Sequence, residues 1–155
     1  MARITTNTAG TQPVVEIATA VSGNITIPCL QDITITNSTG VYTYTCFDEA
    51  DVRKLSTPAD NEISMNIVID PETYFGNSTA TANSAAYFGI ATLSTDKVAI
   101  NFTIYWAGNT AAATDYVTTG SGFISGLAPT TSPEAPVWVT PITIAVDGSL
   151  TNTQQ

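Results

Sequence analysis

The sequence predicts a mainly β fold: a β-sandwich or barrel of two packed antiparallel sheets, with one short flanking α-helix at about residues 83–95. Three observations predict it. Apolar and polar residues alternate along most of the chain, turn-forming residues separate these stretches, and one segment departs from the alternation. With 155 residues and 43% hydrophobic content, we expect a single domain over residues 1–155. Its ends are predicted to be a polar N-terminal arm of about residues 1–12 and a polar C-terminal tail of about residues 149–155.

The strands are predicted in chain order. VVEIATAV is a first strand, and DITITNSTGVYTYTCF is typical of a hairpin with its turn at residues 37–40. EISMNIVI and KVAINFTIYW show the clearest alternation. One face of EISMNIVI carries Ile63, Met65, Ile67 and Ile69. One face of KVAINFTIYW carries Val98, Ile100, Phe102, Ile104 and Trp106. DYVTT, GFISGL and VWVTPITIAV complete the set. Residues 128–136 are expected to be an extended loop, and Pro141 indicates an edge, a bulge or a break in the last strand.

The helix is predicted from NSAAYFGIATLSTD, residues 83–96. This stretch begins with Asn and Ser, which are preferred at helix starts, and it spaces Ala86, Ile90 and Leu93 along one helical face. Gly89 weakens the helix. The DPE sequence at residues 70–72 is interpreted as a strand terminator with a turn-forming proline.

Charge and composition exclude several function classes. The net charge is −9, and Arg3, Arg53, Lys54 and Lys97 are the only basic residues, which argues against nucleic-acid binding. The chain has no histidine, so it lacks the commonest general base and most zinc ligands. We therefore expect no enzyme, no catalytic or metal site and no cofactor.

One acidic stretch, FDEADVRKLSTPADNE at residues 47–62, holds five of the thirteen acids and two of the four bases. A calcium site is disfavoured because Asp48, Glu49 and Asp51 lack alternate spacing and the stretch has no glycine. A glycosidase-type carboxylate pair is disfavoured because acids in such a stretch are usually solvated. Two interpretations stay open: a mobile solvated surface loop, or a loop that meets a partner.

Cysteines and aromatic residues each leave an alternative open. Cys29 and Cys46 are predicted to be reduced and to act as small buried hydrophobes, with a disulfide between them as the alternative. Tyr42, Tyr44, Tyr105, Trp106 and Trp138 fall at strand positions and are expected to form cross-strand or core packing, with a glycan-binding platform as the alternative. The polar start of the chain predicts no secretion signal, and no apolar run reaches membrane-span length.

The order of these elements resembles that of the major tail tube proteins of long-tailed bacteriophages of the lambda type. The matching pieces are Gly122-Phe123-Ile124-Ser125 in one strand and Ile142-Thr143-Ile144-Ala145-Val146-Asp147-Gly148 in the last, closed by a glycine turn. The resemblance covers about residues 33–150 and rests on element order and weak motifs. The acidic loop is shorter than the lambda type leads one to expect.

The resemblance implies a structural virion protein. Six subunits would form a ring, rings would stack into the hollow tail tube, and DNA would pass through it during ejection without specific binding. The implied partners are further copies of the chain and the tail terminator, tape measure and distal tail proteins. The implied location is the virion tail after assembly in the host cytoplasm, with no membrane involved. A capsid decoration (cement) protein and an immunoglobulin-like glycan-binding or adhesion module are the alternatives.

The same resemblance assigns roles to particular residues. The acidic loop, residues 47–61, is expected to be the inter-ring contact, ordered only when another ring docks on it. Its expected contact residues are Phe47, Asp48, Glu49, Asp51, Val52, Arg53, Lys54, Leu55 and Asp60. The polar faces of the two clearest strands are expected to face the channel or a subunit seam, through Ser64, Asn66, Asn101 and Thr103.

Overall fold

The fold is mainly β, as the alternation of apolar and polar residues predicts. A computed structural model describes residues 13–27, 29–47, 50–106, 116–132 and 135–154, and the expected N-terminal arm lies outside these ranges. The described part contains one eight-stranded antiparallel sheet and two short helices. In chain order the elements are β1 (Val14–Ala18), β2 (Ile25–Thr26), β3 (Leu30–Thr45), β4 (Val52–Val68), α1 (Pro71–Phe75), α2 (Ala85–Thr95), β5 (Ile100–Tyr105), β6 (Tyr116–Leu127), β7 (Thr130–Ser132) and β8 (Ala135–Gln154).

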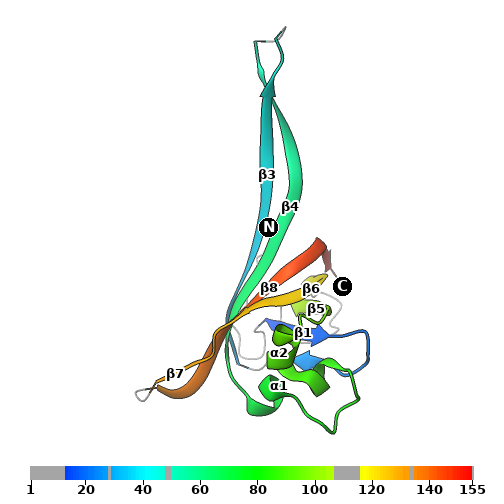
Figure 1. The fold of residues 1–155 in the computed structure, drawn as a ribbon, viewed down its shortest axis with the longest axis vertical. Coiled ribbons are helices and arrows are strands. Elements are labelled where there is room, and N and C mark those ends of the chain that lie inside the picture. The colour runs from blue at the N-terminus through cyan, green and yellow to red at the C-terminus, as the bar shows by residue number, and fades with distance from the viewer. Residues whose placement is uncertain (1–12, 28, 48–49, 107–115, 133–134, 155) are drawn as a thin grey trace.

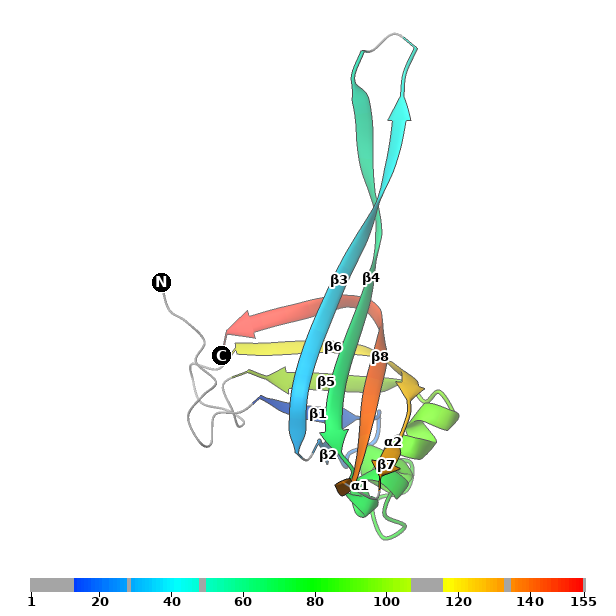
Figure 2. The same ribbon diagram turned by 90° about the vertical axis from the view of Figure 1, so that its left-hand side faces the viewer.

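The sheet folds back on itself into two layers (Figures 1 and 2). Its strand order is β2-β1-β5-β6-β8-β4-β3, with β7 paired to β8. The long strand β8 connects the layers, because Ile142 pairs with Met65 of β4 on one side and with Leu127 of β6 on the other. The two expected sheets are therefore layers of one continuous sheet, with the corner made by a strand that belongs to both. We call them the β3–β4 layer and the β5–β6 layer.

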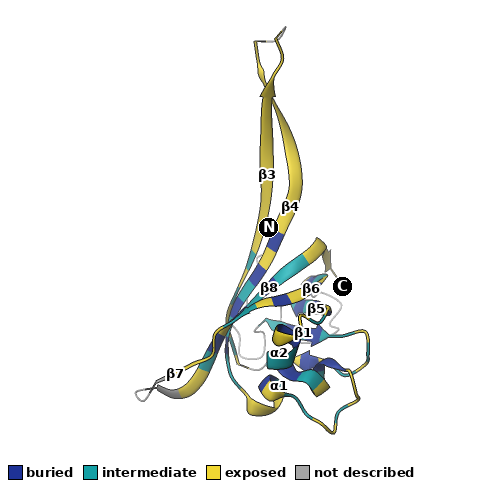
Figure 3. Ribbon diagram, viewed as in Figure 1, coloured by how far each residue is buried: buried dark blue, intermediate teal, exposed yellow. Residues whose placement is uncertain are grey.

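The core lies between the two layers and against the helices (Figure 3). The apolar faces predicted for the two clearest strands are buried and belong to one hydrophobic cluster, which includes Ile63, Met65, Ile67, Ile100, Phe102 and Ile104. Burying an aliphatic or aromatic side chain of this size contributes about 1.5–3 kcal/mol. A shift of register by one residue would bring every polar neighbour inside, so this burial fixes the register of both strands.

Both helices begin at side-chain caps. Asp70 accepts a hydrogen bond from the Thr73 N–H at 3.0 Å and starts α1 with Pro71 in its first turn. The DPE sequence therefore follows the end of β4 at Val68, as predicted, and also starts a helix. Ser84 caps α2 in the same way, by accepting from the Tyr87 N–H at 3.2 Å. The predicted helix is confirmed, but Gly89 kinks it with φ 69° and ψ 165°. A Cβ at Gly89 would lie 2.3 Å from the Gly76 nitrogen, so glycine permits close packing of α1 against α2.

The hairpin turn predicted at residues 37–40 is wrong. β3 continues through these residues without turning, and the chain turns after Thr45 instead. Gly40 lies at a register shift between Thr39 and Val41, where a Cβ would come 2.3 Å from Thr57 Oγ1. The glycine therefore serves a bulge with close cross-strand approach rather than a turn. The acidic stretch was also wrongly predicted to be a loop, because residues 52–61 belong to β4.

The end of the chain contains more strand than expected. Residues 130–132, predicted to be part of a loop, form β7 and pair with β8. β8 runs without a break through Pro141, which pairs with Asn66 of β4. On the other side of β8 the partner changes at this proline, because the β6–β8 ladder ends at Ile142 and the β7–β8 ladder begins at Val139. DYVTT and GFISGL contribute to one strand, β6, with two irregularities. Residues 149–154, assigned to a polar tail, form the last part of β8, and residues 151–154 of this stretch pair with β6.

Candidate interaction surface

The most distinctive feature of the molecule is a two-stranded arm that projects from the body (Figures 1 and 2). We define the hairpin arm as residues 38–60, from the Ser38–Asp60 pair outward, of which residues 48–49 are not described. Every described residue of the arm is exposed, and at about 3.3 Å per residue its strands extend roughly 25 Å beyond the body. No other strand of the described part covers either of its faces (Figure 3).

The arm forms a strand ladder because its residues favour extended backbone. Residues 41–45 are all threonine, valine or tyrosine, and these residue types are among the most enriched in strands. The ladder runs in register from the Val41–Ser56 pair to the Thr45–Val52 pair. At the base of the arm, the side-chain amide nitrogen (Nδ2) of Asn61 donates to the Gly148 carbonyl at 3.3 Å. The buried Oδ1 of the same side chain accepts no hydrogen bond. One hydrogen bond thus links the base of the arm to β8, and one buried side-chain oxygen beside it has no hydrogen-bond partner.

Cross-strand pairing sorts the arm residues onto two faces. Tyr42 pairs with Leu55 and Tyr44 pairs with Arg53, so these four residues share one face. The rings of Tyr42 and Tyr44 are stacked, with centroids 6.2 Å apart. The other face carries Val41, Val52 and Lys54. Half of the large hydrophobic side chains exposed in the described part lie on the arm, including Phe47 beyond the end of β3.

An arm of this kind has little to hold it in place within a single subunit. A two-stranded hairpin without a covered face is at best marginally stable in water. The outer edge of β3 and the free edge of β4 along residues 52–60 also present unpaired backbone groups, which invite pairing with another chain. The exposed apolar residues and the free edges therefore both point to a partner surface.

Charge is unevenly distributed along the molecule. Arg53 and Lys54, two of the four bases, lie near the tip of the arm. The one base described on the body, Lys97, donates from Nζ to the Ile124 carbonyl at 3.2 Å. The described acids of the body are Glu16, Asp32, Glu62, Asp70, Glu72, Asp96 and Asp147. In the sequence the outer part of the arm, residues 42–55, which we call the arm tip, also carries Asp48, Glu49 and Asp51, so it has both signs of charge and is not basic overall.

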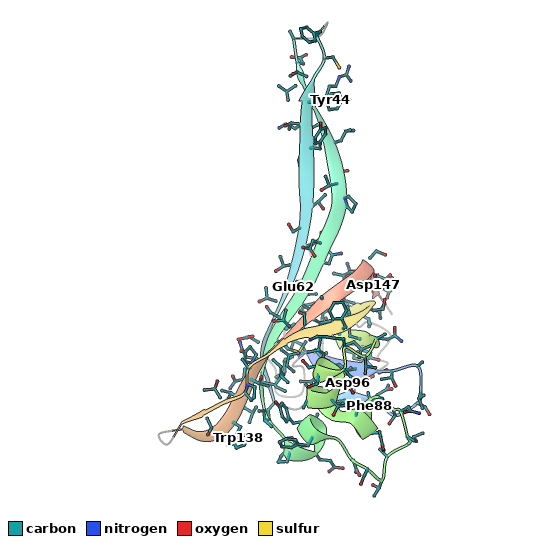
Figure 4. All side chains as sticks on the ribbon, in the orientation of Figure 1. Tyr44, Glu62, Phe88, Asp96, Trp138 and Asp147 are labelled. Atoms are coloured by element: carbon teal, nitrogen blue, oxygen red, sulfur yellow. The ribbon has the colours of Figure 1, made fainter. Side chains whose placement is uncertain are left out.

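A second apolar surface lies at the opposite end of the long axis, where Figure 4 places Trp138, far from Tyr44 on the arm. It is a pocket of about 330 Å³ between α1 and the start of β8, which we call the base pocket. Its lining residues are Ile69, Pro71, Phe75, Val137 and Trp138. Phe75 is 63% exposed and Trp138 is 50% exposed, so large apolar area faces solvent here. A contiguous exposed apolar surface of this kind marks an interaction site more often than isolated exposed residues do.

The four residues expected to face a channel or a seam do point away from the core. Ser64, Asn66 and Thr103 are half-buried, and Asn101 is exposed. They lie on different layers, however, because Ser64 and Asn66 belong to β4 and the other two to β5. The outer surfaces of the two layers face away from each other (Figures 1 and 2), so one subunit cannot turn both pairs toward the same lumen.

The outer face of the β3–β4 layer is acidic and polar. Asp32 and Asn66 are neighbours across β3 and β4, and the Asn66 amide nitrogen donates to both Asp32 carboxylate oxygens, at 3.0 and 2.8 Å. Thr36 and Glu62 form another outward pair. The described residues of this layer below the arm include no Lys or Arg.

The titratable groups with a clear shift have structural explanations. Hydrogen bonds from the Thr73 N–H and hydroxyl hold the pKa of the Asp70 carboxyl below its ordinary value, as expected at a helix N-terminus. Burial, with a further contribution from the nearby Glu16 carboxylate, raises the pKa of Tyr105. Among the described residues, no cluster of His, Cys, Asp and Glu could hold a metal ion. No described helix is long and apolar enough to span a bilayer.

The expectation that the two cysteines are buried is wrong, because both are exposed and free. Cys29 precedes β3 and Cys46 follows it, so a sixteen-residue strand separates them. A disulfide needs Cα atoms within about 7 Å of each other. An internal bridge between Cys29 and Cys46 is therefore excluded in this fold.

The aromatic residues do not form one platform. Tyr42 and Tyr44 lie on the arm and Trp138 lies in the base pocket. Trp106 is half-buried and donates from Nε1 to Thr118 Oγ1 at 2.8 Å, and Tyr105 is half-buried beside Glu16. The described aromatic residues therefore do not provide the single exposed face that the glycan-binding alternative requires.

The predicted contact residues and the observed arm overlap in part. Phe47, Asp51, Val52, Arg53, Lys54, Leu55 and Asp60 are all exposed on the arm, whereas Asp48 and Glu49 lie outside the described residues. Sequence reasoning missed the partner strand, with Val41, Tyr42 and Tyr44, and it missed the base pocket. The alternation in VYTYT predicts a strand but contains no signal that this strand pairs with the acidic stretch outside the body.

The fold has counterparts among solved structures, although no protein-family model and no curated protein matches the sequence. The tail of an empty gene transfer agent (GTA) particle, determined by helical refinement with C6 symmetry, is similar with a TM-score of 0.61 and 14% identity, covering 90% of this chain and 95% of that chain. The SPP1 tail tube gives a TM-score of 0.61 and 12% identity, covering 93% and 77%. The PVC sheath/tube terminator of an extracellular contractile injection system gives 0.59 and 14%, covering 92% and 93%. The chain therefore has the fold of these tail and tube proteins.

Proposed function

We propose that this chain is the structural subunit of a phage-type tail tube. Copies would form hexameric rings, the rings would stack into a hollow tube, and the tube would conduct DNA during ejection. One observation carries the proposal: a body with the fold of tail and tube proteins bears a hairpin arm with both faces exposed. Such an arm needs a partner surface, and a neighbouring copy in a stack supplies one.

The arm has enough apolar surface to contribute to stacking. Tyr42, Leu55 and Phe47 are among its exposed hydrophobic side chains. Each large side chain that becomes buried against another copy contributes about 1.5–3 kcal/mol. Arg53, Lys54 and Asp51 would set register and partner choice more than affinity, since charges at an interface act mainly on specificity and association rate. In this proposal the inter-ring contact is a strand ladder held in place by stacking, rather than a loop that becomes ordered on docking.

Ring closure would use the free sheet edges. β3 forms one edge of the sheet, and the last part of β8, beyond its pairing with β4, has a free edge as well. Long exposed edges are an aggregation hazard in a monomer, but a closed ring leaves none of them free. The low proportion of charged residues, 11%, fits a chain that buries much of its surface against further copies.

The β3–β4 layer is the better candidate for the wall of the lumen. Its outer face combines Ser64 and Asn66 with the acids Asp32 and Glu62. An acidic wall would repel the DNA backbone and would let it slide through without specific binding. The β3–β4 layer also continues directly into the hairpin arm, so a wall made from it would extend from one ring to the next (Figure 2). Asn101 and Thr103 would then lie on the outside of the tube or at a subunit seam.

The remaining assignments follow from the proposed role. The chain would be located in the virion tail after assembly in the host cytoplasm. The ends of its tube would meet terminator, tape measure and distal tail proteins. The sheath/tube terminator among the similar structures supports such end contacts for this fold.

Electron microscopy of two purified proteins tests the proposal. The first is the full chain, which should form tubes or six-fold rings. The second is an armless variant in which an Asn-Gly turn replaces residues 39–59 between the paired residues Ser38 and Asp60, because Asn-Gly suits a two-residue hairpin. The armless variant should remain folded and soluble but should not form tubes.

Two results would contradict the proposal. Small closed oligomers of the full chain without rings or tubes would favour the capsid decoration alternative. Normal tubes from the armless variant would show that the arm is a solvent-exposed hairpin with no role in stacking.

A further inference from the structure

A head-to-tail polymer needs two different complementary surfaces on one chain, one at each end. The hairpin arm provides a surface at one end of the long axis, and the base pocket provides another at the opposite end (Figures 1 and 4). The arm tip presents Tyr42, Phe47 and Leu55 to solvent. The base pocket presents Phe75, Val137 and Trp138. Both surfaces are thus apolar, and both lack a covering element within the described part of the subunit.

We propose that the base pocket of one copy receives the arm tip of a copy in the next ring. This inference rests on the proposed tube function and adds the surface on which the arm docks. The occupant is a second copy of this chain, and its contact with the pocket is heterologous and open-ended, as a stack requires.

One exposed base of the tip, Lys54, has a charge opposite to that of the pocket rim. Pro71 lines the base pocket, and its sequence neighbours Asp70 and Glu72 are exposed acids of α1. Hydrogen bonds from Thr73 keep the Asp70 carboxyl ionised to lower pH than usual. Lys54 at the arm tip is exposed and has the opposite charge. Lys54 can therefore pair with the acidic rim, while the acids of the tip, Asp48, Glu49 and Asp51, would be directed away from it.

The short β7 segment of a lateral neighbour is the competing occupant. β7 spans three residues and lies at the same end of the molecule as the base pocket (Figure 1). β7 therefore cannot contact a copy displaced along the long axis, whereas the hairpin arm extends along that axis away from the pocket. A contact with β7 would link copies within one ring and would leave the arm tip without its receiving surface.

Cysteine cross-linking in assembled tubes tests the inference, because Cys46 already lies at the arm tip and is exposed. Cys29→Ser removes the other thiol. Val137→Cys or Phe75→Cys, added separately, then places a thiol at the base pocket. Two independent pocket variants guard against a failure of either one to fold. The matched control is Phe123→Cys, which places a thiol at another exposed apolar position on the body. Each protein is treated with a short bismaleimide and analysed by denaturing electrophoresis.

The expected result is a ladder of covalent multimers from tubes of the pocket variants. Its yield should exceed that of the Phe123→Cys control on the order of tenfold, since groups held side by side react at a raised effective concentration. The ladder should disappear when the tubes are dissociated before treatment. Normal tubes of both pocket variants without a ladder would overturn this inference and leave the tube function standing. Equal cross-linking in unstacked rings would overturn it in favour of a lateral contact. If the full chain forms no tubes at all, the proposed function itself fails.

Discussion

Tyr42 and Tyr44 stack on one face of the hairpin arm, with their ring centroids 6.2 Å apart and both side chains exposed. Aromatic pairs of this kind dominate interface energetics when a partner buries them, because they combine large apolar area with few rotatable bonds. Within a single subunit the pair is covered only in part, since Tyr42 is 61% and Tyr44 is 37% exposed. The stack is therefore better explained by assembly than by the stability of the subunit.

The first prediction separates these two roles. Replacing both tyrosines by serine (Tyr42→Ser with Tyr44→Ser) should change the free energy of unfolding of the subunit by no more than about 0.5 kcal/mol, as is usual for exposed positions. The same variant should fail to form tubes. Urea unfolding and light scattering measure the two effects. Tyr116→Ser, at an exposed position on the body, is the control and should assemble normally. Assembly of the double variant at the normal rate would remove the tyrosine pair from the contact.

The second prediction concerns charge. Lys54→Glu reverses the charge of an exposed base at the arm tip and should slow assembly, because the bodies of the other copies are acidic. The effect should weaken as salt is added, since exposed charges are screened over about 10 Å at 0.1 M ionic strength. Assembly rates of the wild type and the variant at low and high salt measure it. A variant that assembles as fast as the wild type at low salt would mean that charge does not guide docking.

A third prediction tests the packing of the β5–β6 layer. A Cβ at Gly120 would lie 2.6 Å from Phe102 Cζ, so Gly120 leaves room for the buried ring. Gly120→Val should destabilise the subunit by about 1–3 kcal/mol, as overpacked cores generally do. The smaller side chain of Phe102→Leu should offset part of this cost, so the double variant should be more stable than the sum of the single effects predicts. Strict additivity in urea unfolding would show that the two residues do not compete for space.

The fourth prediction is a pH dependence at the start of α1. Because hydrogen bonds from Thr73 lower the pKa of Asp70 in the folded state, its ionised form stabilises the protein above the ordinary value of 3.8. This stabilisation is lost as the pH falls through the lowered folded-state value. Asp70→Asn keeps a cap but not the charge, so the wild type should exceed it in stability at neutral pH and lose that advantage in strong acid. An advantage that is unchanged across this pH range would contradict the assignment.

The sequence predicts the body of this protein better than its arm. The alternation around Ile63 to Ile67 and Ile100 to Ile104 identifies buried faces, and burial then fixes strand and register. The same alternation in VYTYT leads to no buried face, so it could not show that β3 continues outward. Gly40 had the signature of a turn, but only the close approach of Thr57 shows that it forms a bulge. Local sequence contains no information about such a cross-strand neighbour.

The candidate site was predictable in part for the same reason. The acidic stretch stood out by composition, which correctly placed Phe47, Val52 and Leu55 at the surface. Composition could not show that this stretch pairs with residues 39–45, nor that Phe75 and Trp138 meet at the other end of the molecule. Both are relationships between segments distant in sequence, and they depend on how the sheet folds.

Hydrogen exchange of the arm amides tests the central claim most directly, because it compares the same residues in the free subunit and in the assembled tube. In the free subunit, amides of residues 38–60 should exchange quickly, as expected for a two-stranded ladder exposed on both faces. In tubes, the same amides should become strongly protected, while the buried strand around Ile100 to Ile104 should exchange slowly in both states. Arm amides that exchange as fast in tubes as in free subunits would contradict the claim that the hairpin arm joins one copy to the next.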